Sequence, residues 1–199
     1  LKPEHISAYS LIVEEGTLFN EWFGEEGERQ EELPDEATDR RMYEITEQKL
    51  EENGYYRYEI SNYALPGYEC KHNIGYWKRK EYLGLGLGAA SLLFDYTMEG
   101  QKKNIRCSNV QNLNCYLNIG VEQDMFGEII HDEYKWTQEQ TKLTKKEQME
   151  EFMFLGLRMM EGVSPGEFEE QFGKSLQEVY GSQIAKLEKQ GLLEQKEGT

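Results

Sequence analysis

A short segment in the first half of the chain carries the residue types best suited to bind a planar, apolar ligand. His72 and Asn73 are followed at close spacing by Tyr76 and Trp77. An imidazole nitrogen can ligate haem iron, and the faces of aromatic rings can stack on a macrocycle. A single His beside Tyr and Trp is also common at packed, hydrogen-bonded corners of proteins. The residue types alone therefore leave a ligand site and a structural corner as open alternatives.

Basic residues surround this segment, although the chain as a whole is acidic. The 199 residues contain 22 Lys and Arg against 38 Asp and Glu, which gives a formal net charge of −16. Cations clustered beside the segment could meet carboxylates such as the propionates of a porphyrin. The cations in question are Lys71, Lys78, Arg79 and Lys80.

A glycine-rich stretch from Gly84 to Ser91 is the second candidate for ligand binding. Repeated glycines let a ligand approach the backbone closely, and the spacing nearly satisfies a dinucleotide-binding fingerprint with Ala89 in its last position. However, neither a helix opening at this point nor an acidic residue about 20 positions further on is evident. Tight packing between a strand and a helix is the alternative explanation.

Composition and charge exclude several classes of function. The acidity argues against binding to duplex DNA or to an anionic membrane surface, because both need a basic protein surface. No apolar run approaches the ~20 residues of a membrane-spanning helix, and no signal peptide is evident. Cys70, Cys107 and Cys115 lack the spacing of a zinc site, an iron–sulfur site or a disulfide framework. We therefore expect free thiols and a reducing, cytoplasmic location.

The elements that must position these residues can be predicted from apolar periodicity and capping residues. Residues 5–13 are predicted to form a buried strand, and the acidic residues 21–36 a solvated loop. A helix is predicted to begin after Asp35 and to end at Gly54. Residues 55–64 alternate in character, which predicts one strand with a polar face.

The last third of the chain has a helical pattern. A capping box at Thr144 begins a helix that is predicted over 144–161, apolar nearly all round and therefore buried. Ser164 caps a second, short helix, a third is predicted over 176–189, and a strand over 192–194. Three helices that lead into a strand resemble a winged-helix unit. In so acidic a chain we expect this unit to pack on the other domain rather than to bind DNA.

Four segments, taken in order, are similar to one protein family. Three of them resemble the oxygen-independent coproporphyrinogen III oxidase-like radical SAM proteins. They are PEHISAYSLIVEEGTLF, YEISNYALPGYECKHNIGYW and YLGLGLGAASLL. The motif His72-Asn73-x-x-Tyr76-Trp77 resembles the haem-chaperone, or HemW-like, branch of that family rather than the true oxidase. The segment FMFLGLRMMEGVSPGEFEEQFG resembles the C-terminal helical domain of the family.

The resemblance implies an α+β (α/β) fold in two parts. Residues 1–136 would supply late strands of a partial (β/α)6 radical SAM barrel with an added sheet. Residues 137–199 would form a truncated, winged-helix-like helical domain. In the full-length family the barrel binds S-adenosylmethionine and a 4Fe-4S cluster, which is held by a Cys-x3-Cys-x2-Cys loop. No such loop occurs in these 199 residues. Since the chain also starts at Leu1, we expect a fragment that cannot cleave S-adenosylmethionine reductively.

The resemblance also assigns residues to ligands. Haem is expected on His72 as the iron ligand, with the motif residues Asn73, Tyr76 and Trp77 beside it. By similarity to the oxidase, residues near S-adenosylmethionine would be Ile12, Ile74 and Ala90.

Three functional hypotheses follow. The first is a haem-binding part of a chaperone that delivers haem to an acceptor protein, and the second is a part of a coproporphyrinogen III oxidase that decarboxylates propionates. The third is a folding and interaction domain whose site is completed by residues outside this chain. Exposed barrel edges in such a fragment would also favour a homodimer.

Overall fold

The chain divides into two units in the computed structural model, which describes residues 2–98, 101–118 and 137–196. Unit 1 comprises Leu1–Ile74 together with Arg158–Gly162, and unit 2 comprises Gly75–Leu157 together with Val163–Thr199. The predicted domain boundary after residue 136 borders residues outside the described ranges, so it stays a prediction.

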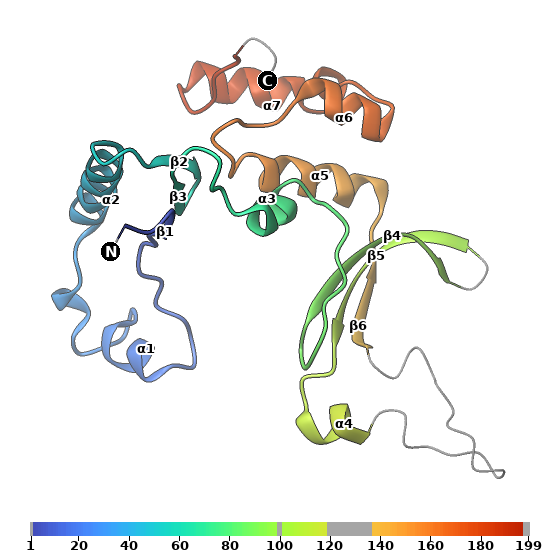
Figure 1. Cartoon of the computed structure of the whole chain (residues 1–199), viewed down its shortest axis with the longest axis horizontal. Helices are drawn as coiled ribbons and strands as arrows, with labels where there is room; N and C mark the ends of the chain where they lie inside the picture. Colours follow the sequence, from blue (N-terminus) through green and yellow to red (C-terminus); the bar gives the residue numbers. More distant parts are fainter. Residues whose placement is uncertain (1, 99–100, 119–136, 197–199) are drawn as a thin grey trace. The chain divides into compact units, whose positions relative to one another are not determined.

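Unit 1 is built on a small antiparallel sheet. The strands β1 (His5–Ser7), β2 (Tyr56–Glu59) and β3 (Asn62–Ala64) have the order β1-β3-β2 (Figure 1). The middle strand, β3, contains Tyr63 and Ala64, which are both fully buried. The helical elements of this unit are α1 (Leu18–Phe23), the 3-10 helix η1 (Gln30–Glu32) and α2 (Glu36–Glu51).

The predicted start and end of α2 are confirmed. The Asp35 side chain accepts a hydrogen bond of 2.8 Å from the backbone N–H of Thr38, which satisfies one of the free amides at the helix start. Gly54 follows the helix with a φ of 85°, a left-handed conformation that glycine adopts without strain. Both signals are local, so sequence was sufficient to find them.

Two strand predictions were too long. Only His5–Ser7 of the predicted strand 5–13 pairs in a sheet, and Ile12 beyond it is 76% exposed. The predicted strand 55–64 is a hairpin of β2 and β3, whose turn is supported by the Glu59 carboxylate accepting a 3.1 Å bond from the Ser61 N–H. Alternating side chains fit one strand or two joined by a tight turn equally well, so the pattern alone could not separate them.

A distant segment completes the hairpin. The backbone N–H of Ile60 donates to the carbonyl of Arg158, and the N–H of Met160 donates to the carbonyl of Tyr58, both at 3.1 Å. Glu59 and Met159 form the antiparallel bridge between these bonds. Residues 158–162 therefore belong to unit 1, and the helix predicted to reach residue 161 ends earlier.

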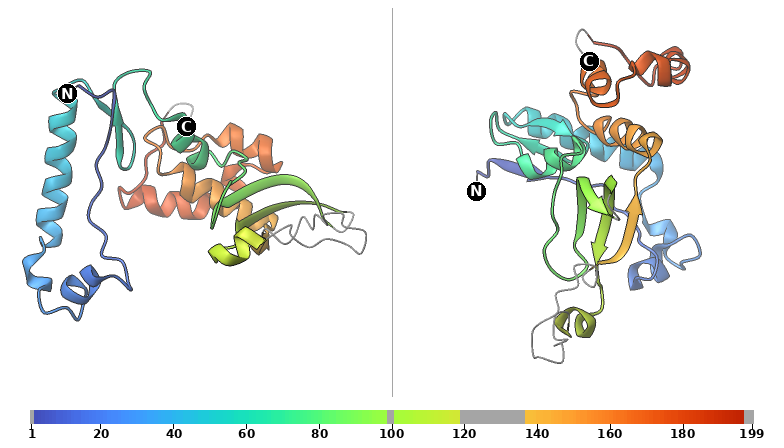
Figure 2. Two further views of the ribbon diagram at one scale, coloured as in Figure 1. Left: turned by 60° about the horizontal axis from the view of Figure 1, so that its bottom comes forward. Right: turned by 90° about the vertical axis from the view of Figure 1, so that its right-hand side faces the viewer.

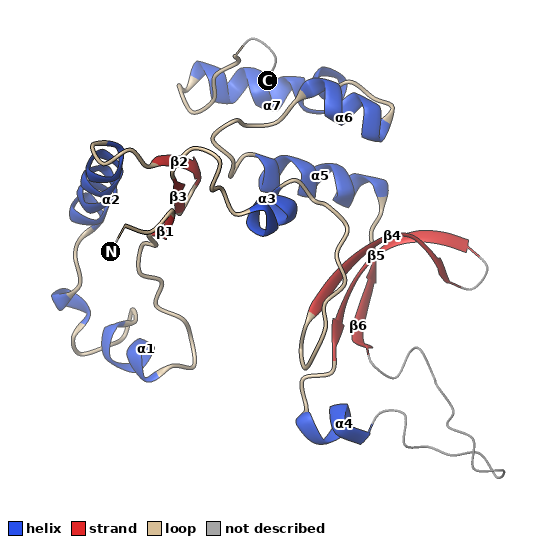
Figure 3. Cartoon of the chain, viewed as in Figure 1, coloured by secondary structure: helices blue, strands red, loops and turns tan. Residues whose placement is uncertain are grey.

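Unit 2 contains a second antiparallel sheet and most of the helices (Figure 3). Its strands, in the order β4-β5-β6, are β4 (Ala90–Met98), β5 (Gln101–Asn109) and β6 (Thr137–Lys142). The helix α4 (Leu113–Asn118) follows β5. The remaining helices are α5 (Lys145–Gly156), α6 (Pro165–Phe172) and α7 (Leu176–Lys189), which lie together in both views of Figure 2.

Apolar side chains from these three helices form the core of unit 2. The Phe152 ring packs edge-on against the rings of Phe168 and Phe172, with centroids 5.5 and 5.7 Å apart. Serine and threonine caps begin each helix where the sequence predicted, with full capping boxes on α5 and α7. The buried members of the core are Met149, Phe168, Phe172, Leu176 and Ile184.

Two expectations for the helical part were wrong. The helix α5 is not buried nearly all round, because Phe154 is 58% exposed and Leu157 is 42% exposed. Residues 192–194 form no strand, although Leu193 packs against the helical core. The described residues thus give a mixed α/β fold with two antiparallel sheets. Barrel strands and a winged-helix wing remain predictions about a longer protein.

Candidate functional site

The predicted haem motif lies on one short helix, α3 (Lys71–Trp77). His72 is exposed, whereas Asn73, Tyr76 and Trp77 are half-buried. Residues four apart in a helix lie on the same face, so His72 shares its face with Tyr76. The structure therefore brings the predicted ligand and one predicted stacking ring into register along α3.

Gly75 leaves this face of α3 bare. It follows His72 by three positions and so lies on the same side of the helix. A Cβ atom at Gly75 would meet no atom within 4 Å. Glycine inside a helix costs about 1 kcal/mol relative to alanine. No packing contact among the described residues requires a glycine here. What the glycine provides is an open helix surface beside His72.

Tyr58 holds the start of α3 from the neighbouring strand β2. Its hydroxyl oxygen accepts a 3.3 Å hydrogen bond from the backbone N–H of Cys70 and binds the Asn73 side chain. The same hydroxyl lies 2.8 Å from Nε2 of His5 on β1. Burial raises the pKa of Tyr58, while the bond from the Cys70 N–H opposes that shift. The phenol is therefore neutral at ordinary pH and available as both donor and acceptor.

Within unit 2, Tyr76 of α3 contacts an anchored tyrosine. The rings of Tyr76 and Tyr82 meet edge to face, with centroids 4.7 Å apart. Nη1 of Arg106 donates a 3.1 Å hydrogen bond to the Tyr82 hydroxyl. The same guanidinium also pairs with the carboxylate of Glu151 at 3.0 Å. Tyr82 thus presents a fixed edge to the motif tyrosine.

One of the four basic residues beside the motif is buried and forms an ion pair inside the protein. Arg79 is 2% exposed, and its Nε donates to Oε2 of Glu151 at 2.7 Å. This side chain is therefore not a surface cation, contrary to the sequence-based expectation. The three lysines around it are exposed and keep that potential role.

The glycine-rich stretch is a tight loop and not a dinucleotide site. The loop leads into strand β4 and not into a helix, so the amides of a helix start do not face a phosphate here. Asn109 donates from Nδ2 to the carbonyls of Gly84 and Gly86, at 3.3 and 2.8 Å. A Cβ at Gly84 would lie 2.1 Å from the carbonyl oxygen of Ala90, so this glycine is needed for close packing.

The residues predicted near S-adenosylmethionine lie on three different segments of the chain. Ile12 is exposed in the segment after β1, and Ile74 is half-buried in α3. Ala90 begins strand β4 in unit 2 and is exposed. Their assignment to the nucleotide stays a prediction.

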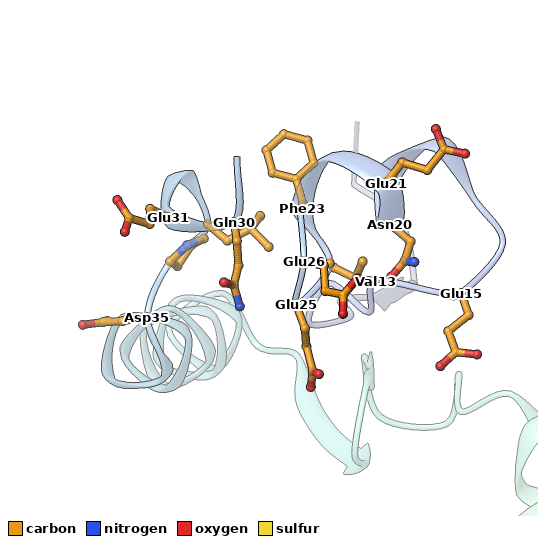
Figure 4. A pocket seen from close by; sticks show the side chains of 13 residues that line it. Val13, Glu15, Asn20, Glu21, Phe23, Glu25, Glu26, Gln30, Glu31 and Asp35 are labelled. Carbon is orange, nitrogen blue, oxygen red and sulfur yellow. The ribbon is translucent and has the colours of Figure 1, made fainter. Parts of the chain in front are cut away.

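One of the pockets in unit 1 is lined largely by carboxylates (Figure 4). Its carboxylates come from the segment before α1, from α1 itself and from the turns that precede α2. Within residues 2–98, 101–118 and 137–196, no group of three His, Cys, Asp or Glu side chains could hold a metal ion. The negatively charged lining of this acidic pocket would repel a propionate. The pocket carboxylates are Glu15, Glu21, Glu25, Glu26, Glu31 and Asp35.

Sequence reasoning missed Tyr58 and Gly75. Tyr58 lies in the predicted strand 55–64, where nothing distinguished its hydroxyl from those of the neighbouring tyrosines. Gly75 was visible as a glycine between His72 and Tyr76, but its meaning depended on the segment being a helix. A helical assignment of 71–77 would have drawn attention to it.

The chain was compared with known proteins. The family model described as the HemN C-terminal domain matches residues 143–199. Heme chaperone HemW of Lactococcus lactis is 38% identical over 193 residues, covering 97% of this chain and 45% of the relative. Heme chaperone HemW of Bacillus subtilis is 37% identical over 197 residues, covering 99% of this chain and 46% of the relative. The chain thus spans less than half the length of these relatives.

A solved structure supports the same relationship at the level of fold. Coproporphyrinogen III oxidase (HemN) from Escherichia coli, described as a radical SAM enzyme, matches with a TM-score of 0.61 at 17% identity. The match covers 99% of this chain and 44% of that one. No helix in the described part of the chain is long and apolar enough to cross a membrane. By sequence and by fold, this chain corresponds to the C-terminal portion of HemW/HemN-like proteins.

Proposed function

We propose that this chain carries the haem-binding site of a HemW-like haem chaperone. The observation that carries the proposal is the face of α3 on which exposed His72 stands beside bare Gly75 and the half-buried ring of Tyr76. Imidazole ligates haem iron through a ring nitrogen. A surface without a side chain beside that imidazole leaves room for the flat macrocycle.

The surrounding charges fit the same cargo. Lys71 and Lys78 are exposed at the two ends of α3, and Lys80 is exposed shortly after it. An ammonium group attracts a propionate as a point charge. The acidic remainder of the protein would disfavour the same anionic ligand elsewhere. Binding would therefore concentrate at α3.

A carrier role follows from how such a site would hold its cargo. A single exposed histidine gives a ligand that another protein can reach and replace. Two of the relatives are named heme chaperone HemW. We propose delivery of haem to an acceptor protein as the activity of the whole protein, with S-adenosylmethionine near Ile12, Ile74 and Ala90 in that longer form.

The second candidate is a part of a coproporphyrinogen III oxidase. The fold match to the oxidase HemN favours it. Its substrate also carries carboxylates, but a porphyrinogen holds no iron for His72 to ligate. Iron dependence of binding therefore separates the two functions.

The test is a titration of the 199-residue chain with haem and, separately, with metal-free coproporphyrin. The proposal predicts a saturable Soret shift for haem that is lost in His72→Ala and kept in His131→Ala, the matched change at another histidine. Equal binding of both tetrapyrroles, unaffected by His72→Ala, would support the oxidase-type site instead. No saturable shift with either ligand would contradict both assignments for this chain.

A further inference from the structure

The Tyr58 hydroxyl has three partners from two segments, β1 and the start of α3. A phenol oxygen accepts two hydrogen bonds and donates one. The hydroxyl oxygen accepts a 3.3 Å hydrogen bond from the Cys70 N–H and also bonds the Asn73 side chain. Its third partner is Nε2 of His5, 2.8 Å away.

Two of these partners flank His72 in sequence. Cys70 immediately precedes α3, and Asn73 lies in its first turn. His72 follows Cys70 by two positions and directly precedes Asn73 in the first turn of α3. Its position therefore depends on the backbone around it, and that backbone is tied to the Tyr58 hydroxyl on both sides.

The support behind Tyr58 is rigid. Its ring is 5% exposed and packs at 5.7 Å from the His5 ring. Tyr58 belongs to strand β2, which pairs with β3. The backbone carbonyl of Tyr58 accepts a 3.1 Å hydrogen bond from the Met160 N–H. A ligand is held more precisely when its support is locked by packing and hydrogen bonds. Tyr58 meets this condition within unit 1.

We propose that Tyr58 is a positioning residue that fixes the first turn of α3 and thereby presents the His72 imidazole to its ligand. The inference rests on the proposed function, since it takes haem iron as that ligand. It adds a residue outside the sequence motif, 14 positions before His72. It also gives His5 a role as the hydrogen-bond partner of the Tyr58 hydroxyl on β1.

The first test compares Tyr58→Phe with Tyr55→Phe. Both tyrosines are buried in unit 1, and the Tyr55 hydroxyl donates to the carbonyl of Pro3, away from α3. Loss of a group that orients a metal ligand typically weakens binding by 10–100-fold. We expect haem affinity about tenfold weaker and an altered visible ligand-field spectrum in Tyr58→Phe. Tyr55→Phe should match the unchanged chain in both.

A double-mutant cycle identifies the route of the effect. In an Asn73→Leu background one of the two links is already cut, so Tyr58→Phe should weaken haem binding by clearly less than it does alone. Full additivity of the two changes would contradict an action of Tyr58 through α3.

Amide hydrogen exchange decides the inference without any ligand. Tyr58→Phe should speed exchange at Cys70 and in the first turn of α3, and Tyr55→Phe should not. If the unchanged chain binds haem through His72 but Tyr58→Phe alters neither affinity nor exchange, the positioning role is overturned. If haem binds equally well to His72→Ala, the proposed function is contradicted. The exchange data alone then confirm or refute the anchoring of α3 by Tyr58.

Discussion

Nε of Arg79 lies 2.7 Å from Oε2 of Glu151, and only 1% of the Arg79 side chain is exposed. The other oxygen of the same carboxylate pairs with Arg106 at 3.0 Å. One carboxylate thus serves two guanidinium groups and joins the start of unit 2 to β5 and α5. Its loss would leave a buried positive charge without a counter-ion.

Glu151→Gln is therefore expected to destabilise the protein by about 3 kcal/mol, since breaking a buried ion pair from one side leaves the other charge uncompensated. Chemical denaturation followed by circular dichroism measures the change. The matched control is Glu150→Gln, because Glu150 is half exposed and pairs with Lys146 at 3.5 Å. The control should cost less than about 1 kcal/mol. Equal losses in the two variants would contradict the buried role of Glu151.

Gly75→Ala should stabilise the protein while weakening haem binding. Alanine gains up to about 1 kcal/mol over glycine inside a helix, and the added methyl group meets no atom within 4 Å. The same methyl group would stand on the face proposed for the macrocycle. Thermal unfolding and a haem titration measure the two effects on one variant.

Gly156→Ala is the control for that substitution. Its Cβ would lie 2.4 Å from Cγ1 of Val163, so we expect a loss of about 1–3 kcal/mol from overpacking. A Gly75→Ala variant that is more stable and binds haem as before would show that the macrocycle does not use this face.

Tyr63→Phe should raise stability, most of all at high pH. The Tyr63 side chain is fully buried, and its hydroxyl has no hydrogen-bond partner among the described residues. Burial raises the pKa of Tyr63 above its usual value of 10.0. The neutral phenol is thus favoured by folding, so stability is complete below about pH 10 and falls as pH rises through the raised pKa.

The corresponding measurement is the free energy of unfolding between pH 8 and about 11, in parallel with the phenolate absorbance. We expect Tyr63→Phe to be more stable by about 1 kcal/mol at pH 8 and to lose less stability on further alkalinisation. A variant that loses stability at pH 8 would indicate that the hydroxyl has a partner in solution.

Ile12→Lys should reduce self-association of the chain. Ile12 is 76% exposed and Leu11 is 63% exposed, directly after the edge strand β1. Exposed apolar residues beside a sheet edge favour pairing with another copy, and lysine opposes it. Sedimentation velocity over a range of concentrations measures the effect, with Leu83→Lys, at another exposed leucine, as the control. An equal effect of both variants would assign the association to general hydrophobicity.

The parts of the fold that sequence predicted are those fixed by neighbouring residues. Ser164 and Ser175 cap α6 and α7 through groups three positions away, so both helices were found with nearly correct ends. The hairpin of β2 and β3 was missed because alternating side chains fit one long strand as well as two strands joined by a tight turn. The bridge from Glu59 to Met159, which lies roughly a hundred positions further on, was missed because it is distant in sequence. No local pattern announces such a contact.

The candidate site likewise combines features that the local sequence indicates with features that depend on contacts between distant residues. The types and spacing of His72 and Tyr76 marked the segment as a candidate, and its assignment as a haem site stays a prediction. The role of Tyr58 depends on bonds to Cys70 and His5 that exist only after the sheet has formed. Arg79 was misassigned as a surface cation because its partner, Glu151, is 72 positions away.

The closure of unit 1 by residues 158–162 determines when this protein can fold during its synthesis. The carbonyl of Arg158 reaches the N–H of Ile60 only after most of the polypeptide has left the ribosome. At translation rates of roughly 5–20 residues per second, the β2 edge waits several seconds for its partner. Throughout that interval the Tyr58 carbonyl lacks the Met160 N–H that it binds in the finished fold. The nascent chain therefore passes through a stage in which the β2 edge is unpaired.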